Sequence, residues 1–443
     1  MNPNPMANNQ YPLTIHEAAA AMRSGALTPI DLLEQCLARI DIYEPWVRAW
    51  VVIDRAGARE HAQRLTEELK RGQVRGPLHG LPVGVKDIID VFDLPTGCGQ
   101  LTPRESRGAK CDATCVKRLR AAGAIILGKT VTTAYAYLDP PVTRNPWDPT
   151  RTPGGSSSGS AAAVACGMCL AALGTQTVGS LTRPASYCGV CSFKPSFGAI
   201  VTDGVLPLAP TLDHVGVMAQ CVTDLAILGD VLIENRFPFS NTDDPPVFVT
   251  LGGPFVDRVE PAMALAMDRV RDAAYGANIK TGDWPAGAAD LPRHLRAILA
   301  TEAAAIHGDG LHRQPDCYPS RIRELIEEGM VVPAADYRSA LDHRTAIQTL
   351  MAESFFSGAT TQITPATPGP APDCSTTGDG SFNAPWSYCG LPTVSLPIGR
   401  TESGLPLAAQ LVGGPNDIAR LMAAAAWLER RVGFDMRLPP VPK

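Results

Sequence analysis

The order of hydrophobic and polar residues predicts that this 443-residue chain begins with amphipathic helices. Apolar residues recur at helical spacing over residues 30–42. Thr28 and Pro29 precede that run, and they are a favoured helix cap and a favoured first helical residue. Earlier in the chain, Thr14 and Glu17 have the spacing of a capping box. The pattern therefore predicts two helices at the start of the fold.

Strand and helix patterns then alternate. The expected elements up to residue 173 are a charged helix at 54–72, a buried strand and turn at 81–91, a helix at 112–122, a short strand at 124–127, a Gly/Ser-rich turn at 154–160 and an Ala-rich segment at 160–173. Further helical stretches are expected near 221–234, 258–275, 290–306, 319–328 and 416–431. This alternation is typical of an α/β layer fold. No Ser/Gly linker or repeat divides the chain, so residues 1–443 are expected to form a single domain on which the helices of 14–72 pack.

Composition and charge narrow the class of protein. Hydrophobic residues make up 45% of the chain and charged residues 19%, as in ordinary globular proteins. The net charge is -5 and there is no dense Lys/Arg run, so small neutral or mildly charged substrates fit better than nucleic acid. We find neither a secretory signal pattern nor a run of about 18 apolar residues, and therefore expect a cytoplasmic protein without a membrane segment. The 12 cysteines are too sparse for a disulfide scaffold.

Two short patterns match catalytic or nucleotide-binding motifs but lack the required context. GAIILGKT at 123–130 fits the phosphate-binding loop expression, yet its loop positions, 124–127, are strand residues. GSSSG at 155–159 fits the nucleophile elbow of α/β-hydrolases, but the preceding RNPWDPTRTPGG contains three prolines where a strand is needed. That alternative would also need a downstream histidine, for which the candidates are His214, His294, His307, His312 and His343.

A third pattern suggests zinc. Cys166 and Cys169 form one Cys-x-x-Cys pair, and Cys188 and Cys191 form a second at the spacing of a zinc ribbon. The first pair lies in AAAVACGMCLAAL, which suits a buried helix rather than a polar hairpin. We therefore expect these cysteines to pack in the core, and expect no structural zinc from this pattern.

The remaining chemical signal is spread over three segments. They are GLPVGVKDIIDV at 80–91, TPGGSSSGSAAAVACG at 152–167 and GTQTVGSLTRPASYCGVCSFKPSFG at 174–198. Together with GVLPLAPTLDHVG at 204–216 and the C-terminal GLPTVSLPIG and GLPLAAQLVG, they resemble the amidase signature family. The resemblance covers nearly all of the chain and is weakest from about 240 to 360. It implies an α/β fold with one large mixed central β-sheet flanked by helices, and a variable substrate-pocket region at about 240–390.

The resemblance also implies a catalytic triad. Ser180 in VGS corresponds to the nucleophile, Ser156 in GGSSSGS to the bridging serine and Lys86 in VGVKD to the base. It further implies a cis peptide bond between Gly155 and Ser156. Taken alone, the Gly/Ser run would be a flexible linker and a lone strand lysine would lie at the surface. The three segments together favour the catalytic interpretation.

The chemistry of these residue types supports the same roles. A serine attacks an amide only if a base takes its proton and an acid protonates the leaving nitrogen. Lys86 can be that base only when neutral, and burial in its apolar run would lower its pKa, whereas Asp87 and Asp90 would raise it if they lay close. The proton of Ser180 would pass through Ser156 to Lys86, and Ser156 would then protonate the leaving amine.

Residues around the nucleophile are expected to bind the oxyanion or the substrate. The main-chain amides of Thr177, Val178, Gly179 and Ser180 would hold the oxyanion. Arg183 is a candidate to bind a substrate carboxylate, and a structural ion pair is the alternative.

Two positions depart from the family pattern. Many members have glycine at the position of Val178 and an acidic residue at that of Gln176. Valine would be strained if its position required positive φ. Tyr135, Tyr137, Phe382 and Trp386 could line an aromatic pocket, which we expect to lie between 130–145 and 300–390.

The sequence thus predicts hydrolysis of a small amide, or of a carbamate or ester, through an acyl-Ser180 intermediate. No metal or cofactor is expected, and a homodimer is left open. One alternative is an amidotransferase A-type subunit that supplies ammonia from glutamine. Another is a catalytically silent relative that acts as a partner subunit.

Overall fold

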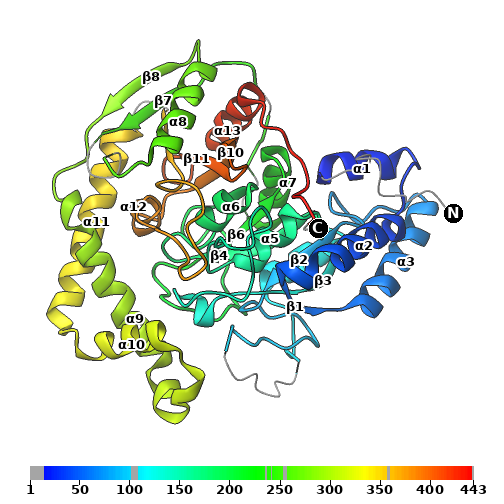
Figure 1. Ribbon diagram of the computed structural model, residues 1–443, viewed down its shortest axis with the longest axis horizontal. Helices are drawn as coiled ribbons and strands as arrows, with labels where there is room; N and C mark the ends of the chain where they lie inside the picture. Colours follow the sequence, from blue (N-terminus) through cyan, green and yellow to red (C-terminus); the bar gives the residue numbers. More distant parts are fainter. Residues whose placement is uncertain are drawn as a thin grey trace.

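The computed structural model describes residues 14–100, 108–234, 237–240, 242–252, 257–356 and 360–441. Its centre is a mixed eleven-stranded sheet in the order β1-β3-β2-β4-β6-β5-β10-β11-β9-β7-β8 (Figure 1). The strands are β1 (Trp50–Ile53), β2 (Pro82–Lys86), β3 (Ile125–Thr130), β4 (Ala171–Gln176), β5 (Cys191–Lys194), β6 (His214–Ala219), β7 (Val247–Leu251), β8 (Asn278–Gly282), β9 (Thr360–Pro365), β10 (Thr393–Arg400) and β11 (Pro406–Val412).

Helices surround this sheet. They are α1 (Ile15–Arg23), α2 (Pro29–Val47), α3 (Arg55–Lys70), α4 (Thr114–Ala121), α5 (Ser158–Ala165), α6 (Thr182–Cys188), α7 (Val222–Leu232), α8 (Pro261–Ala273), α9 (Leu291–Arg313), α10 (Ser320–Val331), α11 (Ala334–Phe355), α12 (Ala384–Tyr388) and α13 (Ile418–Val432). In Figure 1, α2 and α3 lie beside β1 and β3, and the long helices α9 and α11 lie on the other side of the molecule. None of the described helices is long and apolar enough to cross a membrane.

The predicted helix starts at the N-terminus are confirmed. Thr14 caps α1 and accepts a hydrogen bond from the amide of Glu17. Thr28 caps α2, Pro29 is its first residue, and Asp31 completes a reciprocal capping box. These contacts satisfy amide groups that a helix leaves free in its first turn.

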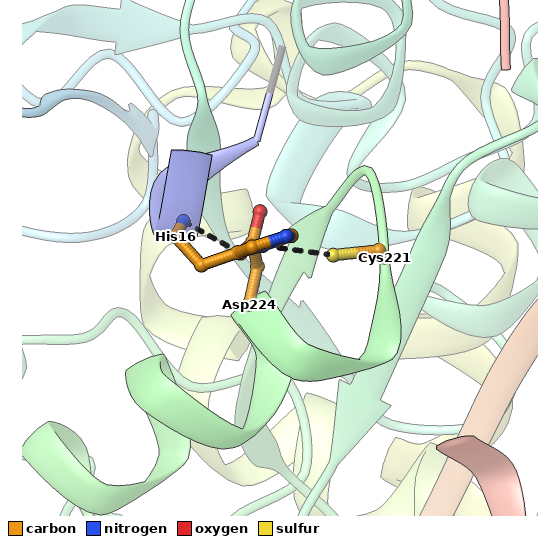
Figure 2. A group of neighbouring side chains, drawn as sticks. All are labelled: His16, Cys221 and Asp224. Carbon is orange, nitrogen blue, oxygen red and sulfur yellow. Dashed lines mark hydrogen bonds and ion pairs between the residues drawn. The ribbon is translucent and has the colours of Figure 1, made fainter. Parts of the chain in front are cut away.

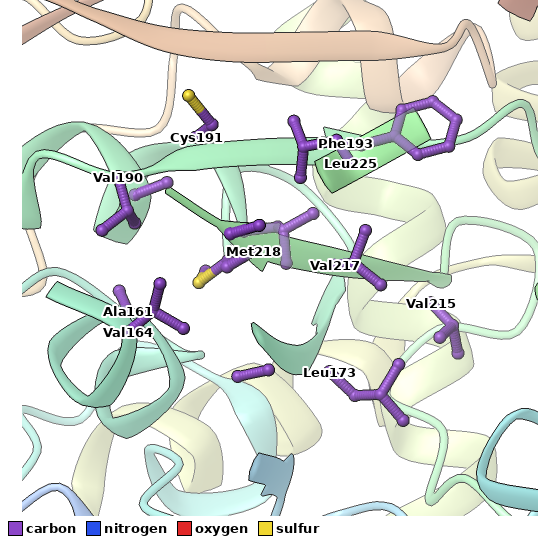
Figure 3. Packing of buried hydrophobic residues seen from close by; sticks show 14 of the residues in the cluster. Ala161, Val164, Leu173, Val190, Cys191, Phe193, Val215, Val217, Met218 and Leu225 are labelled. Atoms are coloured by element: carbon purple, nitrogen blue, oxygen red, sulfur yellow. The ribbon is translucent and has the colours of Figure 1, made fainter. Parts of the chain in front are cut away.

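The middle of the sheet forms the densest part of the core. Strands β2, β4, β5 and β6 are buried along their whole length, because helices and neighbouring strands cover them. Leu173 of β4, Phe193 of β5 and Val217 of β6 lie together, with Val164 of α5 and Leu225 of α7 packed nearby (Figure 3). Because these strands are buried and rigid, they fix the positions of polar side chains at their ends and in the loops that follow them.

The structure differs from the sequence prediction in several elements, which include the Ala-rich segment and the unpredicted helices α6, α11 and α12. The Ala-rich segment 160–173 is not one element, because α5 ends at Ala165, Gly167 adopts a positive φ of 62° and β4 begins at Ala171. Strand pairing with β2 and β6 decides the conformation of this apolar run. Helix α11 was not predicted, since its buried apolar stripe is sparse and consists of Ala340, Ile347 and Met351.

Candidate active site

Three segments that are far apart in sequence meet at one edge of the buried sheet. Lys86 is the last residue of β2, Ser156 lies just before α5, and Ser180 lies in the loop between β4 and α6. Strands β2 and β4 run parallel, so their carboxyl ends point to the same edge. There Lys86 Nζ donates hydrogen bonds to Ser156 Oγ and to Thr175 Oγ1, each at 2.7 Å. The sequence prediction included Ser156 as a partner of Lys86 but missed Thr175.

The loop that carries Ser156 is fixed by the neighbouring strand. The peptide bond between Gly155 and Ser156 is cis, as the family resemblance implied. Ser157 Oγ donates to the carbonyl of Thr175 at 3.2 Å, and the amide of Ser157 donates to the carbonyl of Ser180 at 3.1 Å. The segments of Ser156 and Ser180 are thereby held side by side.

Burial controls the charge of Lys86. The side chain is fully buried, and this lowers its pKa to about 7, while the nearby Asp213 carboxylate acts in the opposite direction. Asp87 does not have that role, because it forms a buried ion pair with Lys129 at 2.9 Å. Asp90 accepts instead from the hydroxyl of Thr96, 2.8 Å away. Asp213, rather than Asp87 or Asp90, is therefore the carboxylate that acts to raise the pKa of Lys86.

Asp213 also organises the cavity wall. Its carboxylate accepts from Thr177 Oγ1 at 2.5 Å and from the amides of Leu208 and Ala209 at 2.8 and 3.0 Å. Burial raises the pKa of Asp213 to about 6 despite these donors. Sequence reasoning quoted this residue within TLDHVG but gave it no role, because its proximity to Lys86 depends on the pairing of β4 with β6.

The loop before Ser180 presents its amides without internal partners. Within the described residues, none of the amides of Thr177, Val178, Gly179 and Ser180 donates a hydrogen bond. Gln176 holds the loop from behind, since its Oε1 accepts from the amides that follow Ser180, at positions 181 and 182, each at 2.9 Å.

Val178 fits this loop without backbone strain. It is not among the residues with positive φ, so the strain considered from the sequence does not occur. Its carbonyl accepts from Ser387 Oγ at 2.7 Å, and Ser387 Oγ accepts in turn from Gln176 Nε2 at 3.0 Å. Gln176, the other departure from the family pattern, thus has a structural role in the same loop.

Arg183 is buried and bonded to main-chain carbonyls. Its Nε and Nη2 donate to the oxygen of Gly155 at 3.2 and 2.7 Å, and its Nη1 donates to the oxygen of Gly378 at 2.6 Å. No ion pair to Arg183 occurs within the described ranges, so carbonyl contacts take the place of the structural ion pair that was considered as the alternative. These bonds brace the peptide that precedes Ser156.

A cavity of about 300 Å³ lies beside Ser180. Its walls are formed by Ala136, Tyr137, Leu138, Thr177, Val178, Ser180, Arg183, Leu208, Arg296, Leu299 and the segment 378–381. A second cavity, of about 200 Å³, shares Ala136, Thr177 and Leu208 with the first and extends toward Thr175 and Asp213. Thr177 therefore belongs to the wall of both cavities.

Of the four aromatic residues predicted to line the pocket, one lines the cavity beside Ser180, and the other three line neither of the two cavities described above. Tyr137 does line the cavity beside Ser180, and its hydroxyl accepts from Arg296 Nη1 at 2.5 Å. Tyr135 is instead stacked on another tyrosine with a centroid distance of 4.2 Å. Phe382 and Trp386 are buried in the core at 3% and 1% exposure. Arg296, on α9, was missed because nothing in its local sequence separates it from an ordinary surface arginine.

The cysteine pairs do not form a ligand set. Cys166, Cys169, Cys188 and Cys191 are all buried, and burial raises the pKa of each thiol. In the part of the chain that the structure describes, the three-residue group of potential metal ligands that comes together lies elsewhere. The residues that fit the phosphate-loop expression lie mainly in β3, as the strand pattern predicted.

Comparisons with known proteins agree on one family. The amidase family description matches residues 31–260. An amidase of Pseudomonas putida is 33% identical over 464 residues, which cover 96% of this chain and 97% of that protein. The A-type subunit of the glutamyl-tRNA(Gln) amidotransferase of Chloroflexus aurantiacus (strain ATCC 29366 / DSM 635 / J-10-fl) is 32% identical, covering 96% of this chain and 98% of that protein.

Solved structures give the same result. The crystal structure of an amidase superposes with a TM-score of 0.87 at 34% identity, covering 94% of this chain and 99% of the other. A peptide amidase in complex with the competitive inhibitor chymostatin superposes with a TM-score of 0.83 at 26% identity, covering 99% and 100% of the two chains.

Proposed function

Because this chain belongs to the amidase family and is an amide C–N hydrolase, we propose that Ser180, Ser156 and Lys86 are its catalytic residues. The observation that carries this proposal is the buried contact of 2.7 Å between Lys86 Nζ and Ser156 Oγ, beside the loop of Ser180. A lysine whose pKa is lowered to about 7 is substantially neutral at physiological pH. It can then accept a proton, which an ordinary lysine cannot.

The reaction follows from these groups in two stages. Ser180 Oγ attacks the carbonyl carbon, and its proton passes to Ser156 as Ser156 gives its own proton to Lys86. When the tetrahedral intermediate collapses, the C–N bond breaks and Ser156 protonates the departing nitrogen, taking a proton back from Lys86. Water then attacks the acyl-Ser180 ester with the same groups acting in reverse, which frees the acid product and Ser180.

The free amides at 177–180 are proposed to stabilise the oxyanion. Each well-placed donor of this kind is worth about 3 kcal/mol in the transition state. Val178 and Gly179 donate through the main chain, so the valine side chain does not remove this contribution. The support from Gln176 and Ser387 keeps the donors in place before substrate arrives.

A small neutral acyl group fits the site better than a carboxylate-bearing one. Arg183 already bonds two carbonyl oxygens, so we propose that it supports the loop rather than binding a substrate carboxylate. Arg296 is paired with Glu328 across the cavity wall and does not present a free positive charge. Linear amides, carbamates and esters all offer the carbonyl and leaving group that the mechanism requires. The proposal also includes a homodimer, which a measurement of the molecular mass in solution would test.

The amidotransferase alternative rests on the similarity to the A-type component of that enzyme. Such a component would release ammonia from glutamine and depend on partner subunits for its biological role. A catalytically silent relative would keep the fold but not react. Hydrolysis of simple amides by the isolated chain, faster than that of glutamine, would exclude both alternatives.

The test is a panel of small aliphatic and aromatic amides, carbamates and esters, with glutamine included. We expect Ser180→Ala to abolish hydrolysis of whichever substrate is cut, and Lys86→Ala or Ser156→Ala to reduce it at least about 100-fold, the order typical of lost acid–base catalysis. Ser192→Ala is the matched control, because Ser192 is a buried serine of β5 that lines neither of the two cavities. Wild-type rates in any triad variant that is still folded would contradict the assignment.

A further inference from the structure

Outside the two cavities, three side chains with different donor atoms meet where α1 packs on α7. They are His16 of α1, Cys221 just before α7 and Asp224 in the first turn of α7 (Figure 2). His16 Nδ1 lies 2.8 Å from Asp224 Oδ1 and 3.7 Å from Cys221 Sγ. All three ligand atoms lie within 4.8 Å of one another. None of the three residues lines either cavity at the active site.

The spacing of these atoms is close to that of a tetrahedral metal site. Zinc binds sulfur at about 2.3 Å and nitrogen or carboxylate oxygen at about 2.0–2.2 Å, so neighbouring ligand atoms lie about 3.3–3.7 Å apart. The separation of His16 Nδ1 from Cys221 Sγ falls in that range, and the shorter contact to Asp224 can lengthen when an ion replaces the shared hydrogen. The distance from Cys221 Sγ to Asp224 Oδ1 is within 4.8 Å, so it must shorten by about 1 Å at most. Rotation of the side chains can supply a movement of that size.

The contacts of the Asp224 carboxylate hold its proposed ligand oxygen, Oδ1, in position before an ion binds. Asp224 Oδ2 accepts from the amide of Ile15 at 2.7 Å, while Oδ1 accepts from the amide of His16 at 3.1 Å and also faces the His16 ring. Without an ion, this carboxylate caps the start of α1 and ties it to α7. With an ion, the Ile15 contact persists and acts as the outer support that metal ligands commonly have.

The charge around the group favours a cation. Asp224 is fully buried on its side chain. Glu429 lies next to Cys221, where it accepts from the amide of Val222 at 2.9 Å, and burial raises the pKa of Glu429 to about 7, so it supplies only part of a negative charge at neutral pH. His16 is the basic side chain in direct contact with Asp224 among the described residues, and it carries a positive charge only when it is protonated. Its side chain is 44% exposed, which leaves a path from solvent for an ion and room for a water molecule as fourth ligand.

We propose that His16 Nδ1, Cys221 Sγ and Asp224 Oδ1 bind one divalent transition-metal ion of the Zn²⁺ type. Binding releases the Cys221 thiol proton to solvent and, when His16 is protonated, the His16 Nδ1 proton as well. Nε2 then carries the remaining ring proton, and Nδ1 donates its lone pair to the ion. The thiolate and the carboxylate then balance the two positive charges. No oxidation or reduction occurs. The ion clamps α1 to α7 and takes no part in hydrolysis.

The protein, stripped with a chelator that is then removed, is titrated with Co²⁺ as a spectroscopic probe. We expect one Co²⁺ per chain, a thiolate-to-cobalt absorption band in the near ultraviolet, and displacement of that band by Zn²⁺. Zn²⁺ should also raise the thermal unfolding midpoint. These readouts do not depend on hydrolysis, so they stand apart from any failure of the catalytic proposal.

The variants locate the ion. In Cys221→Ser the band should disappear and the Kd should rise at least about tenfold, while serine remains a favoured residue at the cap of α7. His16→Gln, at a partly exposed position, should weaken binding to a similar degree and abolish the thermal shift. Cys111→Ser removes an exposed thiol elsewhere and should change nothing. Absence of saturable binding, or a band that survives in Cys221→Ser, would overturn the proposal, as would a band lost in Cys188→Ser but kept in Cys221→Ser.

Discussion

Replacement of Thr175 by valine tests how the charge of Lys86 is controlled. Thr175 Oγ1 accepts one of the two hydrogen bonds that Lys86 Nζ donates. Valine has nearly the same shape, so Thr175→Val removes the acceptor without opening a large gap. The ammonium form of Lys86 loses more than the neutral amine does, because hydrogen bonds from charged donors are stronger. The pKa of Lys86 should therefore fall further.

The size of the shift follows from typical hydrogen-bond energies. A bond to a charged group contributes about 1.5–3 kcal/mol and a neutral bond about 0.5–1.5 kcal/mol, a difference of about 1–1.5 kcal/mol. Since one pKa unit corresponds to about 1.4 kcal/mol, the pKa of Lys86 should fall by about one unit. The starting value is about 7, so the variant should titrate at about pH 6.

The assay is kcat/KM as a function of pH between about 5 and 9. Lys86 must be neutral to act, so activity rises with pH through its pKa, and the acidic limb should move to lower pH in Thr175→Val. Thr143→Val is the matched control, since Thr143 is a buried threonine that bonds the carbonyl of Arg48 and does not contact Lys86. An unmoved limb, or a limb displaced to higher pH, would refute the reasoning.

Three further substitutions have defined outcomes. Asp87→Asn leaves the ammonium group of Lys129 buried without its charged partner and should lower the free energy of unfolding by about 3–5 kcal/mol in urea titrations. Gly179→Ala places a Cβ 2.6 Å from Asn383 Oδ1, so the oxyanion loop must shift. The loss of transition-state stabilisation calculated from kcat should therefore exceed the loss in the free energy of unfolding. His61 is held neutral by burial, which lowers its pKa to about 4, so the unfolded state binds more protons below its ordinary pKa of 6.5. Wild type should lose up to about 3 kcal/mol relative to His61→Leu as pH falls from 6.5 to about 4, measured by chemical unfolding at each pH.

Local sequence signals predicted the frame of this protein well. The caps at Thr14 and Thr28 predicted helix starts, because capping is a contact between residues three positions apart. The apolar run that ends at Lys86 predicted a buried strand, because a run of apolar residues is also a local pattern. The division of 160–173 into helix and strand depends on pairing with distant strands, which no local pattern contains.

The candidate site divides in the same way. Lys86 and Ser156 could be proposed from family motifs, and the structure places them 2.7 Å apart. The contacts of Thr175 and Asp213 could not be derived, because they arise only when β4 lies between β2 and β6. Arg183 was assigned to a substrate carboxylate or an ion pair, whereas its partners are carbonyl oxygens that carry no signal in the sequence.

The most direct test of the catalytic assignment is labelling with a fluorophosphonate, which reacts with activated serines, followed by peptide mapping. We expect wild-type protein to be modified at Ser180 and Lys86→Ala to stay unmodified, because the neutral lysine is needed to take the serine proton. Modification at Ser157 would instead support the nucleophile-elbow alternative. Labelling of Ser180 at the same rate in Lys86→Ala would contradict the proposed role of the lysine.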